Sequence, residues 1–216
     1  MKNKVIAFDC DGTLVNTYNL IQKTFRITFK ELFPDVLVTD QEFESFFGPS
    51  LKETFAKYVD TEEKINYCIE RYRYHNQKIM AEMIEIFDGI KEMLETLKEE
   101  GYKIMIVSNK VGSAVKRSIE LCDIDKYIET IIGYEMIIPK PDPDGIYQAM
   151  KMYDVENLVF VGDTTIDMET GVNANVPTIG VTWCKSSKEE LKNAGATFVI
   201  DKPSELIDII HNNNLF

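Results

Sequence analysis

The chain has 216 residues, with 36 acidic and 24 basic side chains and a formal net charge of −12. This length fits one α/β domain with a large insertion or two small domains. A composition of 44% apolar and 28% charged residues is typical of folded globular proteins and excludes extensive disorder. The acidic excess disfavours nucleic acid as a partner, because that binding requires clustered Lys and Arg. An acidic protein that binds an anionic substrate needs local positive charge, from a bound cation or a few lysines.

The chain shows no sign of a secreted or membrane protein. Its four cysteines form no CxxC pair and no zinc-binding spacing, which indicates reduced thiols. The N-terminal run MKNKVIAFDCDG turns acidic too early for a signal peptide, and no stretch has the apolar length of a membrane span. We therefore expect a cytoplasmic protein without a membrane partner.

The first predicted element is a short buried strand, Val5–Phe8, which ends at Asp9. Helical patterns follow it over residues 17–33, 40–47, 51–59 and 61–83. This stretch is too long to be a loop in a compact domain. We therefore predict an inserted helical subdomain, residues 16–84, between the two segments 1–15 and 85–216 of a catalytic core.

From residue 88 onward, apolar strand patterns alternate with helical ones. The predicted strands are residues 104–107, 158–161, 178–181 and 197–200. Their apolar runs are uninterrupted, as expected for parallel strands buried on both faces. The sequence therefore predicts an α/β fold with a doubly wound parallel sheet, a Rossmann-like core that carries the inserted α-helical cap.

Carboxylates follow two of these strands. Asp9 and Asp11 come after the first strand, and Asp163 follows strand 158–161. In open α/β sheets this edge holds the ligand, and Mg²⁺ prefers carboxylate oxygens together with water and phosphate. The alternatives are an ordinary Asx turn at Asp9–Asp11 and a helix N-cap at Asp163.

Two further loops could bind an anion. Ser108 and Asn109 follow strand 104–107, where a hydroxyl and backbone N–H groups can hold phosphate, although a simple N-cap is the alternative. Lys140 lies between Pro139 and Pro141, which restrict its loop, so its ammonium group could bind phosphate as a point charge. The alternative for Lys140 is a solvated surface lysine. None of the local alternatives explains why acid, hydroxyl, lysine and acid recur in this order at successive strand ends.

This order of motifs resembles the haloacid dehalogenase-like hydrolase superfamily, and the insertion resembles its C1-type cap. The resemblance implies that Asp9 is the nucleophile that forms an aspartyl-phosphate and that Asp11 is the general acid and base. It implies a Mg²⁺ cofactor, held by Asp9, the backbone carbonyl of Asp11 and Asp163, with Asp167 in support. It also implies that phosphate binds to Ser108, Asn109 and Lys140.

The cap resembles the branch of phosphoglycolate phosphatases and related bacterial pyrophosphatases. Its candidate specificity residues are Gly48, Pro49 and Ser50, while Arg71 and Arg73 could contact substrate or simply form a solvated helix face. The expected activity is hydrolysis of a small phosphorylated metabolite by a monomer or homodimer, phosphoglycolate first and inorganic pyrophosphate as an alternative. Two further hypotheses are a β-phosphoglucomutase-like sugar-phosphate mutase and a non-catalytic regulatory module.

Overall fold

The computed structural model describes residues 4–216. The chain forms two compact units, one from residues up to 16 together with 85–216 and the other from residues 17–84. That these units act as a catalytic core and a cap stays a proposal. Over the described residues, no helix is both long enough and apolar enough to cross a lipid bilayer.

The first unit is built on a parallel sheet of six strands in the order β5-β4-β1-β6-β7-β8. The strands are β1 Val5–Phe8, β4 Lys103–Val107, β5 Thr130–Ile132, β6 Val159–Gly162, β7 Thr178–Val181 and β8 Phe198–Ile200. The chain builds outward from β1 to β5 and then returns to add β6 on the other side of β1. This reversal confirms the predicted doubly wound fold and opens a crevice beside β1.

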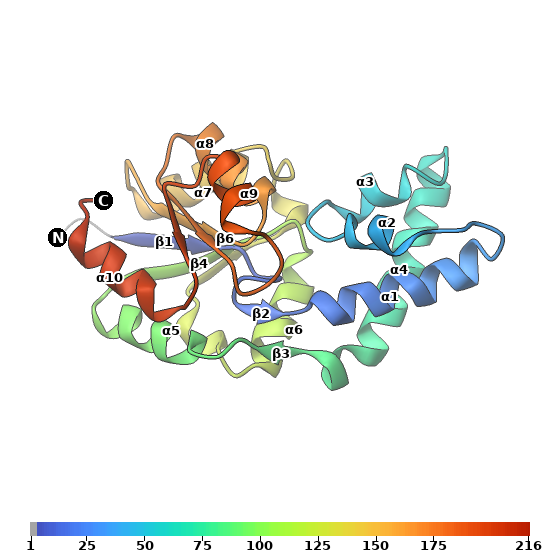
Figure 1. Ribbon diagram of the computed structural model, residues 1–216, viewed down its shortest axis with the longest axis horizontal. Coiled ribbons are helices and arrows are strands. Elements are labelled where there is room, and N and C mark those ends of the chain that lie inside the picture. Colours follow the sequence, from blue (N-terminus) through green and yellow to red (C-terminus); the bar gives the residue numbers. More distant parts are fainter. Residues whose placement is uncertain (1–3) are drawn as a thin grey trace. The chain divides into compact units, whose positions relative to one another are not determined.

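Helices cover both faces of this sheet (Figure 1). One face carries α5 Ile90–Glu99, α6 Gly112–Leu121 and α10 Ser204–Asn212, and the other carries α7 Asp144–Tyr153, α8 Thr165–Ala174 and α9 Lys188–Asn193. The central strands are apolar throughout because both of their faces are covered. For example, Val5, Ala7 and Phe160 are fully buried in the cluster that packs against Ile146 and Ala149 of α7.

A two-stranded antiparallel ribbon joins the ends of the core segments that flank the insertion. Strands β2 (Val15–Asn16) and β3 (Glu85–Ile86) pair through Val15 with Ile86 and Asn16 with Glu85. Each strand has only two residues, so the sequence carried no periodic signal for it. The ribbon brings residues 16 and 85 side by side and closes the core around the point of insertion.

The second unit consists of α1 Tyr18–Leu32, α2 Asp40–Glu44, α3 Leu51–Phe55 and α4 Glu62–Met83. Aromatic side chains fill its core, with Phe25 and Phe29 of α1 packed against Phe46, Phe55 and Tyr72. Helices α2 and α3 end several residues before their predicted ends. Four predicted helices are present because the apolar spacing in each places one face in this core.

Candidate active site

The parallel register places three chemically important loops side by side. Phe8 of β1 pairs with Ile106 of β4 and with Val161 of β6. Asp9 follows directly, and its backbone N–H donates to the carbonyl of Val161 at 2.8 Å. The segments that begin near Asp9, Ser108 and Asp163 therefore leave the sheet at the same edge.

A buried lysine bridges two carboxylates at this edge. The Nζ of Lys140 lies 2.7 Å from Oδ1 of Asp9 and 2.5 Å from Oδ1 of Asp167. Only 4% of the Lys140 side chain is exposed, so Lys140 is not a solvated surface residue. The second oxygen of Asp167 accepts hydrogen bonds from the N–H and the hydroxyl of Thr164 at 3.0 and 2.6 Å. Asp167 is thus held at both oxygens and fixes the ammonium group beside Asp9.

Burial and charge act against each other in this cluster. Burial raises the pKa of Asp9 to about 7, although the ammonium of Lys140 opposes the shift. Burial alone would lower the pKa of Lys140, but the carboxylates of Asp167 and Asp9 outweigh it and hold that pKa above the ordinary lysine value. Lys140 therefore stays charged and favours the ionised form of Asp9.

Asp163 has an unsatisfied oxygen. Its side chain is fully buried, and its Oδ1 accepts a hydrogen bond from the hydroxyl of Thr13 at 2.9 Å. Its Oδ2 has no hydrogen-bond partner among the described residues, and burial raises the pKa of this carboxyl well above the usual range. An unpaired buried carboxylate oxygen is costly unless a cation compensates it.

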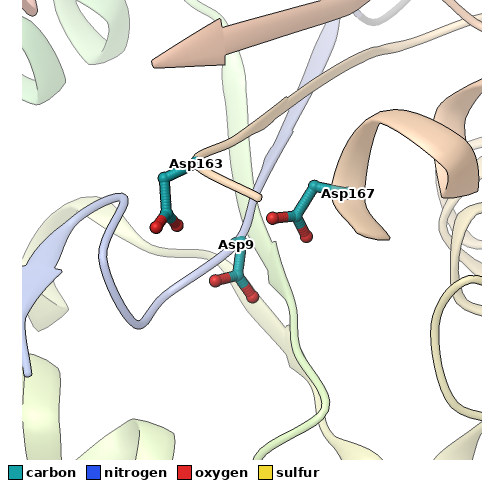
Figure 2. A group of neighbouring side chains, drawn as sticks. All are labelled: Asp9, Asp163 and Asp167. Atoms are coloured by element: carbon teal, nitrogen blue, oxygen red, sulfur yellow. The ribbon is translucent and has the colours of Figure 1, made fainter. Parts of the chain in front are cut away.

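The donor set around Asp163 fits a hard divalent cation. Asp9, Asp163 and Asp167 each offer a carboxylate oxygen, and these oxygens lie within 4.8 Å of one another. Figure 2 shows the three side chains, which come from the residue directly after β1, the loop after β6 and the first turn of α8. Oxygen donors of this kind suit Mg²⁺. Gly12 belongs to the same cradle, since a Cβ there would lie 2.3 Å from Oδ2 of Asp163.

The simple N-cap interpretations do not hold for Asp163, Ser108 or Asn109. The N-cap of α8 is Thr164, which forms a capping box with Asp167. Helix α6 begins at Gly112 and has no side-chain cap. Three of the polar residues at this edge therefore have no capping role in these helices.

Asn109 braces the loop that carries Lys140. Its Nδ2 donates to the carbonyl of Lys140 at 3.1 Å, and its Oδ1 accepts the N–H of Lys140 at 2.8 Å. The sequence predicted Asn109 as a phosphate ligand and gave no hint of this pairing. Ser108 is buried beside it, and its hydroxyl accepts the N–H of Lys110 at 3.2 Å. Phosphate contacts by Ser108 and Asn109 stay predictions.

Asp11 has a charged partner that the sequence did not assign. Its Oδ1 lies 2.8 Å from Nζ of Lys110. Lys110 follows Ser108 and Asn109 directly, so its position at the strand end was the available signal. The pairing of Asp11 with Lys110 rather than with Lys140 depends on side-chain directions that spacing alone does not reveal.

The predicted specificity residues lie in the second unit. Gly48 has a φ of 107°, which favours glycine, and Pro49 follows it. Ser50 caps α3 in a capping box with Glu53, so its hydroxyl already has partners. Arg71 is occupied as well, because its guanidinium binds both carboxylate oxygens of Glu31 at 2.7 and 3.1 Å. Arg73 is exposed, as expected for a solvated helix face.

Comparison with known proteins decides the family. The profile described as haloacid dehalogenase-like hydrolase matches residues 6–181. The chain belongs to the haloacid dehalogenase-like hydrolases. A relative from Listeria monocytogenes serotype 4b (strain CLIP80459), named pyrophosphatase PpaX, is 36% identical over 214 residues, which cover 98% of either chain.

Solved structures of similar proteins share this fold. A structure described as a predicted phosphatase, from Clostridium acetobutylicum, has a TM-score of 0.86 and 28% identity and covers 99% of this chain and 100% of its own. A structure described as a predicted phosphoglycolate phosphatase, from Haemophilus somnus, has a TM-score of 0.84 at 21% identity, covers 97% of this chain and 98% of its own, and shows the fold alone. The chain is thus an enzyme of the phosphatase kind within this family, as the motif order predicted.

Proposed function

We propose that this haloacid dehalogenase-like phosphatase hydrolyses a small-molecule phosphate with Mg²⁺ through an aspartyl-phosphate on Asp9, and that inorganic pyrophosphate is its first candidate substrate. The observation that carries the proposal is the buried cluster of Asp9, Lys140, Asp163 and Asp167, in which one oxygen of Asp163 lacks a partner. Three carboxyl groups share one lysine here, so all three can be ionised together only when a further cation is bound. Such a site is suited to bind a cation before it binds an anionic phosphate.

The surroundings of each site residue support a specific role in the proposed reaction. Lys140 holds Oδ1 of Asp9, which orients the carboxylate and leaves its second oxygen to attack phosphorus. Asp11, two residues along, would give a proton to the leaving group and later take one from water. Ser108 and Lys140 would bind phosphate oxygens, and Asn109 would act through its brace on Lys140.

Mg²⁺ would be held by Asp9, the backbone carbonyl of Asp11 and Asp163, with Asp167 in support. When bound, it supplies positive charge that offsets the repulsion between the carboxylate nucleophile and the phosphate oxygens. The orphaned Oδ2 of Asp163 would then have a partner. Removal of the metal with a chelator should abolish turnover, and Mg²⁺ should restore it.

The choice of substrate rests on similarity. The sequence alone favoured phosphoglycolate and kept pyrophosphate as an alternative. Identity of 36% to a protein named pyrophosphatase, over nearly the full length of both chains, now moves pyrophosphate to first place. A mutase is the remaining enzymatic alternative, and dependence of turnover on a sugar bisphosphate would identify it.

The test is a screen of the purified enzyme with Mg²⁺ against pyrophosphate, phosphoglycolate, hexose phosphates and nucleotides. We expect the highest kcat/KM for pyrophosphate. Asp9→Asn should lower kcat by about 10⁴-fold or more, because the nucleophile is lost while size and fold are kept. Asp125→Asn, an exposed acid of the core, is the matched control and should be fully active. Full activity of Asp9→Asn would refute the mechanism.

A further inference from the structure

Lys110 is held in place from several directions. Its Nζ donates to Oδ1 of Asp11 at 2.8 Å and to the hydroxyl of Ser118 at 3.0 Å. Ser118 is fully buried in α6, and its own hydroxyl donates to the carbonyl of Ala114 at 2.9 Å. The backbone carbonyl of Lys110 accepts the N–H of Tyr134 at 3.0 Å. A flexible lysine chain is thus ordered at both ends.

The pair of Lys110 and Asp11 is largely shielded from water. The two side chains are 16% and 17% exposed, which is far less than in the ion pairs at the surface. Burial alone would lower the pKa of Lys110, but the neighbouring acidic groups, with Asp11 the strongest of them, together outweigh it and raise that pKa above the ordinary value. An ordered, shielded ion pair fixes the direction of a carboxylate far better than an exposed one does.

We propose that Lys110 is a positioning residue that holds Asp11 in the orientation from which it gives a proton to the leaving group. This inference rests on the proposed function, in which Asp11 is the general acid. As the bond from Asp9 to phosphorus forms, the bond from phosphorus to the leaving oxygen breaks. Before this step, Asp11 takes up a proton from solvent on the oxygen that does not bind Lys110. That proton passes to the leaving oxygen, and Asp11 returns to the carboxylate that pairs with the ammonium of Lys110.

The inference predicts a specific kinetic signature. A poor leaving group, such as the alkoxide of an alkyl phosphate, needs the proton, whereas p-nitrophenolate leaves without it. General acid catalysis contributes about 10²- to 10⁴-fold. Loss of the positioning residue should therefore slow alkyl phosphates much more than p-nitrophenyl phosphate. A residue that only maintains the fold would affect both classes equally.

The experiment measures kcat/KM for p-nitrophenyl phosphate, phenyl phosphate and phosphoglycolate. Lys110→Met, which keeps the chain length and removes the charge, should lose about 10²-fold with phosphoglycolate and less than about threefold with p-nitrophenyl phosphate. Lys110→Arg should recover most of the loss. The matched control is Lys103→Met, which removes an ion pair to Glu129 at the opposite end of β4 and should leave all three values unchanged.

A second variant keeps the test decisive if Lys110→Met does not fold. Ser118→Ala preserves both charges and removes one hydrogen bond that holds Lys110. Its losses in kcat/KM should depend on the leaving group in the same way but be smaller. In an Asp11→Asn background, Lys110→Met should cause no further loss. Equal losses for all three substrates, or no loss, in the variants that fold would overturn the inference.

The outcome for Asp9→Asn separates the two proposals. If Asp9→Asn is inactive and the loss in Lys110→Met is uniform, only the role of Lys110 is wrong. If Asp9→Asn remains active, the aspartyl-phosphate mechanism fails, and the role of Lys110 fails with it.

Discussion

The carboxylate of Asp163 has room only because residue 12 is a glycine and carries no side chain. The loop after β1 passes so close to this carboxylate that any Cβ at Gly12 would lie 2.3 Å from its Oδ2. Gly12 also has a φ of +88°, a conformation that L-residues rarely adopt. Glycine is therefore needed at position 12 for two reasons. It allows the turn after β1, and it leaves the space that the proposed cation site needs.

These two requirements can be separated by mutation. Gly12→Ala should lower kcat/KM by more than about tenfold and raise the Mg²⁺ concentration needed for half-maximal activity, because Asp163 must move. Gly101→Ala is the matched control, since Gly101 has a φ of +82° but nothing within 4 Å of its added Cβ. Both variants should lose about 1–2 kcal/mol of unfolding free energy from backbone strain.

Steady-state kinetics with Mg²⁺ titration and thermal unfolding would measure both effects. Equal activity of the two variants would show that the approach of Gly12 to Asp163 is unimportant.

The sequence predicted the residues at the strand ends better than it predicted their partners. Asp9 and Asp163 are recognisable because each follows a strand, and Lys140 because it lies between two prolines, all in a fixed order. The roles of Asn109 and Lys110 are not, since a side chain two or three residues past a strand can turn toward several neighbours. Only the structure shows that Asn109 turns to Lys140 and Lys110 to Asp11.

At the scale of elements, the loop that carries Lys140 depends on a neighbouring loop for its shape. Prolines 139, 141 and 143 supply no N–H groups. The N–H and carbonyl of Lys140 bond instead to the amide of Asn109, which comes from the loop after β4. Two loops that are far apart in sequence thus fix the position of the ammonium group together.

Asn109→Ala should therefore weaken the binding of phosphate without removing any charge. Loss of two hydrogen bonds of about 1 kcal/mol each would cost roughly 30-fold. We expect the inhibition constant of the product phosphate to rise, and kcat/KM to fall, by roughly this factor. Asn157→Ala, which removes an amide bond to the carbonyl of Leu215, is the control and should behave like the unaltered enzyme. An unchanged inhibition constant in Asn109→Ala would contradict the brace.

Apolar patterns in the sequence predicted the strands where the apolar runs were long enough. Strands β1 and β7 have their predicted bounds, because uninterrupted apolar runs mark strands buried on both faces. Strand β5 was not predicted, since its three residues at the sheet edge give no such run. The ribbon of β2 and β3 is shorter still, and its pairing exists only because the insertion begins and ends at one place.

At the scale of the molecule, the chain divides its sequence between a unit that holds the proposed active site and a helical unit with its own aromatic core. Residues 48–50 belong to the helical unit, whereas Asp9 and Lys140 belong to the other unit. The proposal that residues 48–50 influence the choice of substrate is therefore testable by itself.

Gly48→Ala should change selectivity more than chemistry. The added methyl group strains a residue with a φ of 107° and alters the loop before α3. We expect the ratio of kcat/KM for pyrophosphate to that for p-nitrophenyl phosphate to change by about tenfold. Gly101→Ala again serves as the control for strain alone. Parallel changes for both substrates would argue against a role of this loop in selectivity.

The covalent phosphoenzyme is the most direct test of the account. The enzyme is mixed with ³²P-labelled pyrophosphate and Mg²⁺, quenched in acid during the first turnover, and reduced with borohydride, which converts an aspartyl-phosphate to homoserine. The account predicts an acid-stable, base-labile label and homoserine at position 9, both absent in Asp9→Asn. Label or homoserine at any other residue, or rapid turnover with no labelled protein at any quench time, would contradict it.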